Sequence, residues 1–334
     1  MINPSEAGLT LHQRLSKIVL FNELGDRWIS RRKIIAGSKT NLMELGELKY
    51  DWLFSAYQEL KTVSWSADNF NLAKDQKDHS VLPEIERKTF ERVLSSLVFL
   101  ESELLENYYV IGPYFSAPEA TIVVSELTSQ TTYHCYALSQ IIRNTIDKAD
   151  IDSVYNSWRT QDGLRQRNKN INIRFLEFTN NQTVENFLLG LATISTIQLV
   201  LIPSELSLVY SITRRGKMTA TAEILKRIQR DLDLHAQILI RIYLTILNEN
   251  PALTTQELKT SLVKLMRDIT NMETDFTQFL SENMIPGLNN LVVAKFTQAL
   301  TNKVLKEFSL EPLFPGVGGQ PIPWFEGYSE LKNR

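Results

Sequence analysis

Apolar residues recur at three- and four-residue intervals over several long stretches of the chain. This spacing places them on one face of an α-helix. The stretches run from about 44 to 62, 84 to 109, 117 to 146, 183 to 212, 219 to 247, 255 to 280 and 288 to 307. Strand-like alternation is scarce, and no Gly/Ser-rich linker divides the chain. The pattern predicts one all-α domain over residues 1–310, built as a helical bundle, and an irregular Pro/Gly-rich segment over residues 311–334.

Residues typical of helix ends support these boundaries. Ser116 is predicted as an N-cap, with Glu119 at the reciprocal position of a capping box. Gly216 marks a break between two long helices. Thr254 or Thr255 is expected to open the next helix.

One stretch is apolar enough to raise the question of a membrane span. Residues 186–203 form a run of about 17 mainly apolar residues, which is the lower limit for crossing a bilayer. Thr193 and Gln198 interrupt the run, and Glu205 follows it closely. The stretch is therefore predicted to be a buried core helix, because a helix that is apolar all round is expected at the centre of a large bundle.

Composition and charge exclude several classes of protein. A net charge of −2 and a pI near 6.2 provide no basic surface, so nucleic-acid binding is not expected. The single cysteine, Cys135, rules out an internal disulfide framework and suits a reducing compartment. The N-terminus lacks the pattern of a signal peptide. We expect a cytoplasmic protein.

Two predicted helices carry a histidine at a position that matters in metal-binding bundles. Such bundles form a di-metal site from two single carboxylates and two Glu-x-x-His pairs, because residues three apart share a helix face. Here His134 follows Thr131, and His235 follows Leu232, so neither pair has its glutamate. Spacing alone leaves two interpretations open, a lost metal site or hydrogen-bonded core histidines.

Five motifs, in this order, carry a resemblance to a known family. They are RRKIIAGSKTNLMELGELKYDW, VSWSADNFNLAKDQKDHSVLPEIERKTFERVLSSLVFLES, YFSAPEATIVVSELTSQTTYHCYAL, RRGKMTATAEILKRIQRDLDLH and QPIPWF. Together they resemble the small, radical-generating (beta) subunit of class I ribonucleotide reductase over roughly residues 30–326. The resemblance implies a ferritin-like helical bundle and a connection with deoxyribonucleotide biosynthesis.

The resemblance also implies which positions held the metal. Glu101 falls on the first carboxylate ligand, and His134 and His235 fall on the two histidine ligands. The family's three glutamate ligands fall on Thr131, Gln198 and Leu232. Two divalent ions bring a charge of about +4, normally matched by four carboxylates, so no di-iron or di-manganese centre and no other cofactor are expected. A single weakly bound transition ion on Glu101, His134 and His235 stays open as an alternative. In the competing interpretation the histidines hydrogen-bond Glu101 and Asp231.

The resemblance also implies that the residue that carries the radical in the family is replaced in this chain. The radical tyrosine falls on Leu138, while Tyr133 and Tyr136, the nearest tyrosines, are expected on other faces of that helix. Trp65 and Asp231 match the tryptophan and aspartate of the family's radical-transfer relay.

Three hypotheses for function follow. The first is a small-subunit-like pseudoenzyme that forms neither a di-metal centre nor a tyrosyl radical by itself and acts as a structural or regulatory partner. It would form a homodimer, or a heterodimer with an active small subunit, and could contact the reductase large subunit, although residues 311–334 lack the family's long docking tail. The second is an active small subunit of ribonucleoside-diphosphate reductase, or a mononuclear-metal oxidase, with unorthodox chemistry. The third is a repurposed binding or scaffold protein.

Overall fold

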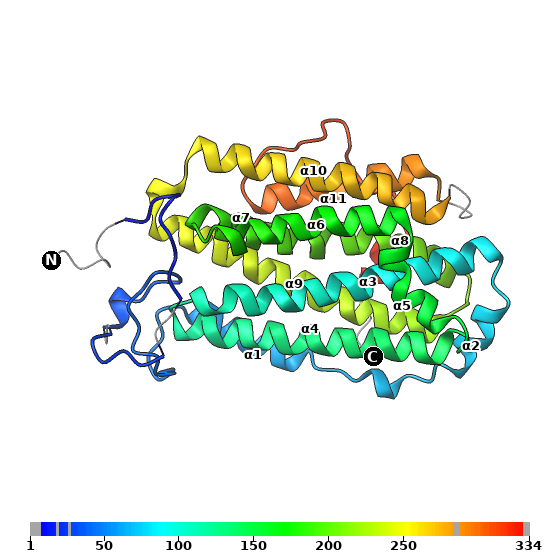
Figure 1. The fold of residues 1–334 in the computed structure, drawn as a ribbon, viewed down its shortest axis with the longest axis horizontal. Helices are drawn as coiled ribbons and strands as arrows, with labels where there is room; N and C mark the ends of the chain where they lie inside the picture. Colours follow the sequence, from blue (N-terminus) through cyan, green and yellow to red (C-terminus); the bar gives the residue numbers. More distant parts are fainter. Residues whose placement is uncertain (1–7, 18–19, 26–27, 283–287, 330–334) are drawn as a thin grey trace.

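Long helices lie side by side along the long axis of an elongated bundle (Figure 1). The structure is a computed structural model that describes residues 8–17, 20–25, 28–282 and 288–329. The helices are α1 (Asp51–Thr62), α2 (Ala73–Ser80), α3 (Glu84–Ile111), α4 (Pro118–Thr145), α5 (Ile151–Thr160), α6 (Asp162–Asn180), α7 (Val184–Thr196), α8 (Ile202–Thr213), α9 (Thr219–Glu249), α10 (Gln256–Ser281), α11 (Asn290–Glu307) and α12 (Glu326–Ser329). Apart from two isolated β-bridges, no strand occurs among the described residues. The predicted all-α architecture is confirmed.

Helices α5 and α6 were missed because their apolar stripe is narrow, and the short helices α2 and α12 were not predicted either. Helix α6 reads DGLRQRNKNINIRFLEFTN, in which polar residues dominate. Its buried apolar residues are Leu164, Ile171, Phe175 and Phe178, at intervals of seven, four and three. Helix α5 is shorter still, with Val154 as its only fully buried apolar residue. Helices with so little apolar surface are stabilised mainly by packing against the neighbouring helices.

The predicted capping box at the start of α4 is wrong. Ala117, which offers no side-chain cap, occupies the N-cap position. The hydroxyl of Ser116 accepts instead from the backbone N–H of Gly37, 3.0 Å away. Glu119 accepts from the backbone N–H of Lys49 at 2.8 Å. Both side chains therefore fix the N-terminal segment against the bundle, an arrangement that local sequence spacing does not reveal.

Two other predicted boundaries are confirmed, whereas the helix expected from about residue 44 begins only at Asp51. Thr255 is the N-cap of α10. Gly216 adopts φ of +82° in the turn between α8 and α9, the left-handed conformation that glycine adopts most easily. Helix α9 has no cap of its own at Met218. The carboxylate of Asp75 in α2 replaces it and accepts from Thr221 N at 2.6 Å, a favourable charge at a helix N-terminus.

The apolar stretch is a core helix, as predicted. Helices α7 and α8 form one continuous run, Val184–Thr213, of which the most apolar window is 89% buried inside the protein. A π-helical turn, η4 (Ile197–Leu201), joins them. Pro203 has no amide hydrogen to donate to the carbonyl four residues earlier, so the regular α-helical bonding pattern is interrupted at this point. The π turn carries Gln198.

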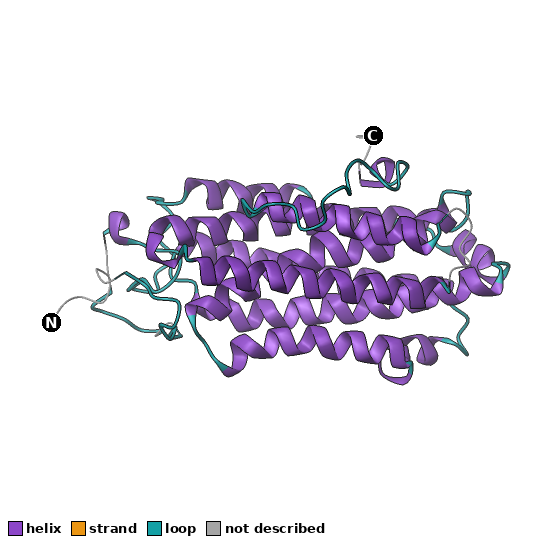
Figure 2. Ribbon diagram, turned by 90° about the horizontal axis from the view of Figure 1, so that it is seen from above, coloured by secondary structure: helices purple, strands orange, loops and turns teal. Residues whose placement is uncertain are grey.

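The segment after α11 runs as a loop over the outside of the bundle before α12 (Figure 2). Its aromatic side chain Phe325 packs on Phe296 of α11 and Tyr210 of α8, with ring centroids 4.7 and 5.7 Å apart. This contact fastens the segment to the body of the bundle.

Candidate functional site

The positions implied as metal ligands lie on α3, α4, η4 and α9 in the interior of the bundle. They are Glu101 on α3, Thr131 and His134 on α4, Gln198 on η4, and Leu232 and His235 on α9. None of these side chains is more than 1% exposed. Leu138, at the implied radical position, is also buried.

His134 bridges two carboxylates. Its Nδ1 lies 3.3 Å from Glu101 Oε2, and its Nε2 lies 3.3 Å from Asp231 Oδ2. Burial opposes a charged imidazole, but the two carboxylates outweigh burial and raise the pKa of His134 to about 9. At neutral pH the ring is therefore an imidazolium that donates a hydrogen bond to each carboxylate. A protonated imidazole has no lone pair left for a metal ion.

Asp231 is held by three donors from different parts of the chain. Besides His134, the indole N–H of Trp65 donates to its Oδ2 at 2.7 Å, and Arg230 donates to its Oδ1 at 2.6 and 2.9 Å. Burial alone would raise the pKa of Asp231, but these donors lower it. The implied relay residues Trp65 and Asp231 are thus joined to His134 by one charged hydrogen-bond network.

His235 has a different environment. Its Nε2 lies 2.8 Å from Oε1 of Gln130, whose amide in turn donates to Leu60 O at 2.7 Å. Burial, together with the charge on His134, lowers the pKa of His235 to about 3, so this ring is neutral. The two imidazoles stack with centroids 5.8 Å apart. His235 Nδ1 is buried without a hydrogen-bond partner.

The three positions on which the resemblance places the family's glutamates contribute no negative charge. Leu232 is apolar, and the hydroxyl of Thr131 is buried without a partner. The amide of Gln198 donates to the hydroxyl of Tyr108 at 2.9 Å, while its Oε1 has no partner. Sequence reasoning missed Tyr108, although it lies seven residues after Glu101 and therefore on the same face of α3.

These residues do not fit a di-metal centre. Glu101 is the only carboxylate at the six implied positions, and it already accepts from His134. Over the described ranges, no three His, Cys, Asp or Glu side chains are grouped so as to hold a metal ion. The positive charge of two divalent ions would remain largely unmatched in an apolar interior, at a cost of many kcal/mol.

A second buried charged cluster lies between α3, α6, α8 and α10. Arg167 donates to Glu205 and, at 3.2 Å, to Glu273. Ser96 donates to Glu205 at 2.9 Å. Burial raises the pKa of Glu205 to about 7 although Arg167 opposes the shift, and the pKa of Glu273 is raised as well. One guanidinium balances one of the two carboxylates, so the pair retains a proton.

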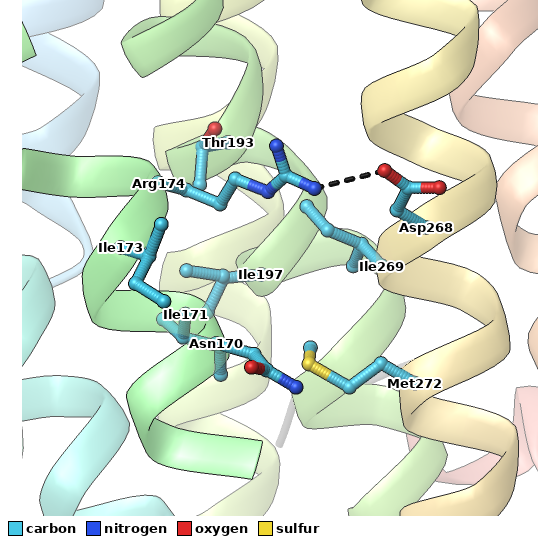
Figure 3. Close-up of a pocket in the computed structure, with 9 residues that line it drawn as sticks. All are labelled: Asn170, Ile171, Ile173, Arg174, Thr193, Ile197, Asp268, Ile269 and Met272. Atoms are coloured by element: carbon cyan, nitrogen blue, oxygen red, sulfur yellow. Dashed lines mark hydrogen bonds and ion pairs between the residues drawn. The ribbon is translucent and has the colours of Figure 1, made fainter. Parts of the chain in front are cut away.

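The side of α7 and η4 that faces α6 and α10 borders a surface pocket of about 340 Å³ (Figure 3). Its floor is apolar, with Ile171, Ile197 and Ile269 pointing into it. Arg174 bridges the rim and pairs with Asp268 at 2.8 Å.

Comparison with known proteins decides the family. The sequence model of the family described as "Ribonucleotide reductase, small chain" matches residues 42–321. The chain belongs to this family. The resemblance drawn from the motifs is confirmed, and with it the ferritin-like fold of the ribonucleotide reductase small subunit.

The family's relatives match over most of their length. The solved ribonucleotide reductase R2 subunit from Clostridium botulinum has a TM-score of 0.92 and 31% identity, and the match covers 96% of this chain and all of that one. Two curated relatives are named ribonucleoside-diphosphate reductase subunit beta. The one from Halalkalibacterium halodurans is 23% identical over 90% of this chain and 87% of its own length. The one from Treponema pallidum is 25% identical over 94% of this chain and 90% of its own length.

Proposed function

We propose that this member of the ribonucleotide reductase small-chain family assembles neither a di-metal centre nor a tyrosyl radical by itself. It acts instead as a structural or regulatory partner in deoxyribonucleotide synthesis. The relatives named reductase subunit beta support the connection with that pathway. The altered ligand positions support the loss of radical generation.

The observation that carries the proposal is the Glu101–His134–Asp231 bridge. The imidazolium of His134 supplies the positive charge that stabilises two buried carboxylates. The added proton on His134 thus supplies the positive charge that a metal ion would otherwise supply at this position. Leu138 adds a second argument, because an aliphatic side chain offers no phenol for a radical.

Metal reconstitution tests the proposal directly. The purified protein is incubated with Fe(II) or Mn(II), exposed to oxygen, desalted, and analysed by elemental analysis and electron paramagnetic resonance. We expect far less than one ion per chain and no radical signal. A matched variant, Thr131→Glu/Gln198→Glu/Leu232→Glu, restores four carboxylates and should bind about two ions per chain. Stoichiometric metal or a radical in the unmodified chain would refute the proposal.

A mononuclear metal site is a second candidate, favoured by two unpaired atoms. Glu101 Oε1 and His235 Nδ1 are both buried without a partner and could serve as ligands. A third ligand from His134 would require loss of its proton, which its raised pKa opposes. One tightly bound ion per chain that His235→Gln abolishes would support this candidate over the first.

The proposed partners are a second copy of this chain, an active small subunit or the reductase large subunit, in the cytoplasm. Analytical ultracentrifugation of the chain, alone and mixed with each subunit, tests these pairs. Formation of a defined complex with either reductase subunit supports the regulatory role. No binding to either subunit would favour a repurposed scaffold.

A further inference from the structure

A row of three aromatic side chains leads from the interior of the bundle to its surface. The rings of Trp65 and Tyr133 meet edge to face with centroids 5.2 Å apart. The rings of Tyr133 and Tyr136 follow with centroids 5.8 Å apart. Trp65 also stacks on His134 at 6.5 Å, whereas Tyr136 is 40% exposed. The row therefore connects the buried histidines with solvent through directly packed, oxidisable rings.

Both ends of the row have a proton acceptor in place. The indole N–H of Trp65 donates to Asp231 at 2.7 Å. The phenol of Tyr136 donates to Asp68 Oδ1, also at 2.7 Å. A phenol that loses an electron becomes strongly acidic, so a carboxylate already bonded to it accepts the proton as the electron leaves. This pairing makes Tyr136 easier to oxidise than a tyrosine whose proton must pass to bulk water.

The middle residue is held in position by the backbone. Tyr133 is half-buried, and its hydroxyl oxygen accepts from the backbone N–H of Ala67. The same short 3₁₀ helix, η2 (Ala67–Asn69), carries Asp68. One turn of chain therefore fixes the orientation of Tyr133 and presents the acceptor to Tyr136.

We propose that Trp65, Tyr133 and Tyr136 form a path for one-electron oxidation that ends on Tyr136, with Asp68 as the proton acceptor. The co-reactant is a one-electron oxidant strong enough to oxidise an indole. The oxidant gains one electron from Trp65, and Tyr136 replaces that electron through Tyr133. Tyr136 ends as a neutral phenoxyl radical, and its proton ends on the Asp68 carboxylate.

The proposal is independent of the proposed function, because the path needs no metal and no tyrosine at position 138. The family resemblance assigns a role only to Trp65 and Asp231. The contacts of Tyr133, Tyr136 and Asp68 come from the geometry of this chain. The path would carry an oxidising equivalent away from the bundle interior to a surface phenol that a reductant or a partner protein can reach.

Photo-oxidation from a fixed point tests the path in the full-length chain. A Thr62→Cys/Cys135→Ser variant carries one thiol for a ruthenium polypyridyl label. The labelled position is exposed and lies three positions before Trp65, which is at most about 11 Å along the chain. A flash with a sacrificial electron acceptor generates the Ru(III) oxidant. We expect a tyrosyl radical in electron paramagnetic resonance, assigned by ring-deuterated tyrosine. Tyr136→Phe should change the hyperfine pattern of this signal, because a tyrosyl radical that remains must lie on Tyr133. Tyr133→Phe/Tyr136→Phe should lower the radical yield about tenfold or more.

Further variants of the labelled protein test the order of the steps. Trp65→Phe should slow formation of the tyrosyl radical, and Tyr133→Phe, which keeps the ring, should leave oxidised Trp65 to accumulate. Asp68→Asn should slow the final step. Tyr109→Phe is the matched control, because this tyrosine is 59% exposed and outside the row, and its loss should change nothing. An unchanged spectrum in Tyr136→Phe, or an undiminished yield in Tyr133→Phe/Tyr136→Phe, would overturn the proposal. So would unchanged rates in both Trp65→Phe and Tyr133→Phe, with circular dichroism confirming that the variants fold.

Discussion

Two buried charged clusters balance their carboxylates in opposite ways, and their α3 members, Ser96 and Glu101, lie between one and two helical turns apart. At Glu101 and Asp231 two carboxylates are balanced by internal cations, the protonated His134 and, for Asp231, also Arg230. At Glu205 and Glu273 a single guanidinium, Arg167, faces two carboxylates, and their raised pKa values show that the second charge is suppressed by a retained proton. The four carboxylates, His134 and Arg167 are each at most 2% exposed, whereas the side chain of Arg230 is 28% exposed.

The difference concerns where the proton resides. In the first cluster the proton is on the base and creates a cation, whereas in the second it is on an acid and removes an anion. Both arrangements keep the net buried charge small, which a bundle interior requires because unpaired buried charges cost several kcal/mol. A buried site with two carboxylates can therefore stay folded without a metal ion, provided that a histidine takes up the balancing proton.

The largest expected effect follows from removal of the guanidinium. Arg167→Leu leaves two buried carboxyl groups without their cation and should lower the free energy of unfolding by about 3–5 kcal/mol. Urea denaturation at neutral pH measures the change. The triple variant Arg167→Leu/Glu205→Leu/Glu273→Leu removes the whole cluster and should recover most of the loss. If the single variant were as stable as the parent protein, the cluster would not be charged as described.

A change of pH is expected to have an intermediate effect on the free energy of unfolding, through the protonation of His134. The pKa of His134 is raised from 6.5 in the unfolded chain to about 9 in the folded one, so the folded state holds its proton more tightly. The resulting stability is complete below pH 6.5 and is lost as pH rises through about 9, by roughly 3 kcal/mol.

Urea denaturation series between pH 7.5 and 9.5, run on the parent protein and on His134→Gln, measure this contribution as the difference between the two slopes. The difference is needed because the raised pKa values of Glu205 and Glu273 also make stability fall as pH rises. His134→Gln should have a clearly smaller alkaline slope, whatever its own stability. The same slope in His134→Gln would show that another group is responsible.

The smallest effect on stability is expected at Thr131, a position that the resemblance assigns to a metal ligand. Thr131→Val replaces a hydroxyl that is buried without a hydrogen-bond partner by a methyl group of similar shape. Because no bond is lost and an unsatisfied polar group is removed, stability should stay equal or rise by up to about 1 kcal/mol. Thermal unfolding compares this variant with Thr128→Val. The hydroxyl of Thr128 donates to Val124 O at 2.7 Å, so its removal should lower the stability. A clear loss at Thr131 would reveal a partner for its hydroxyl.

Local pattern recovered those parts of the molecule whose signal lies within one helix. Three- and four-residue periodicity identified the long core helices, and Glu-x-x-His spacing led to Thr131, His134, Leu232 and His235. Helix α6 was missed because its few buried residues are spread among charged ones. Arg167 lies on that helix, so the second cluster could not be found from pattern either.

The sequence by itself determined the helical bundle and the family, because helical periodicity and the order of the motifs can be recognised along the chain. It also predicted which residues occupy the positions that the resemblance assigns to metal ligands. Only the tertiary structure decided the state of those residues. Glu101 and Asp231 lie 33 and 97 positions from His134, and their combined field, in an interior that water does not screen, fixes the proton on that ring. The contact of Trp65 with Tyr133, which likewise joins distant segments, turns separate aromatic residues into a continuous path.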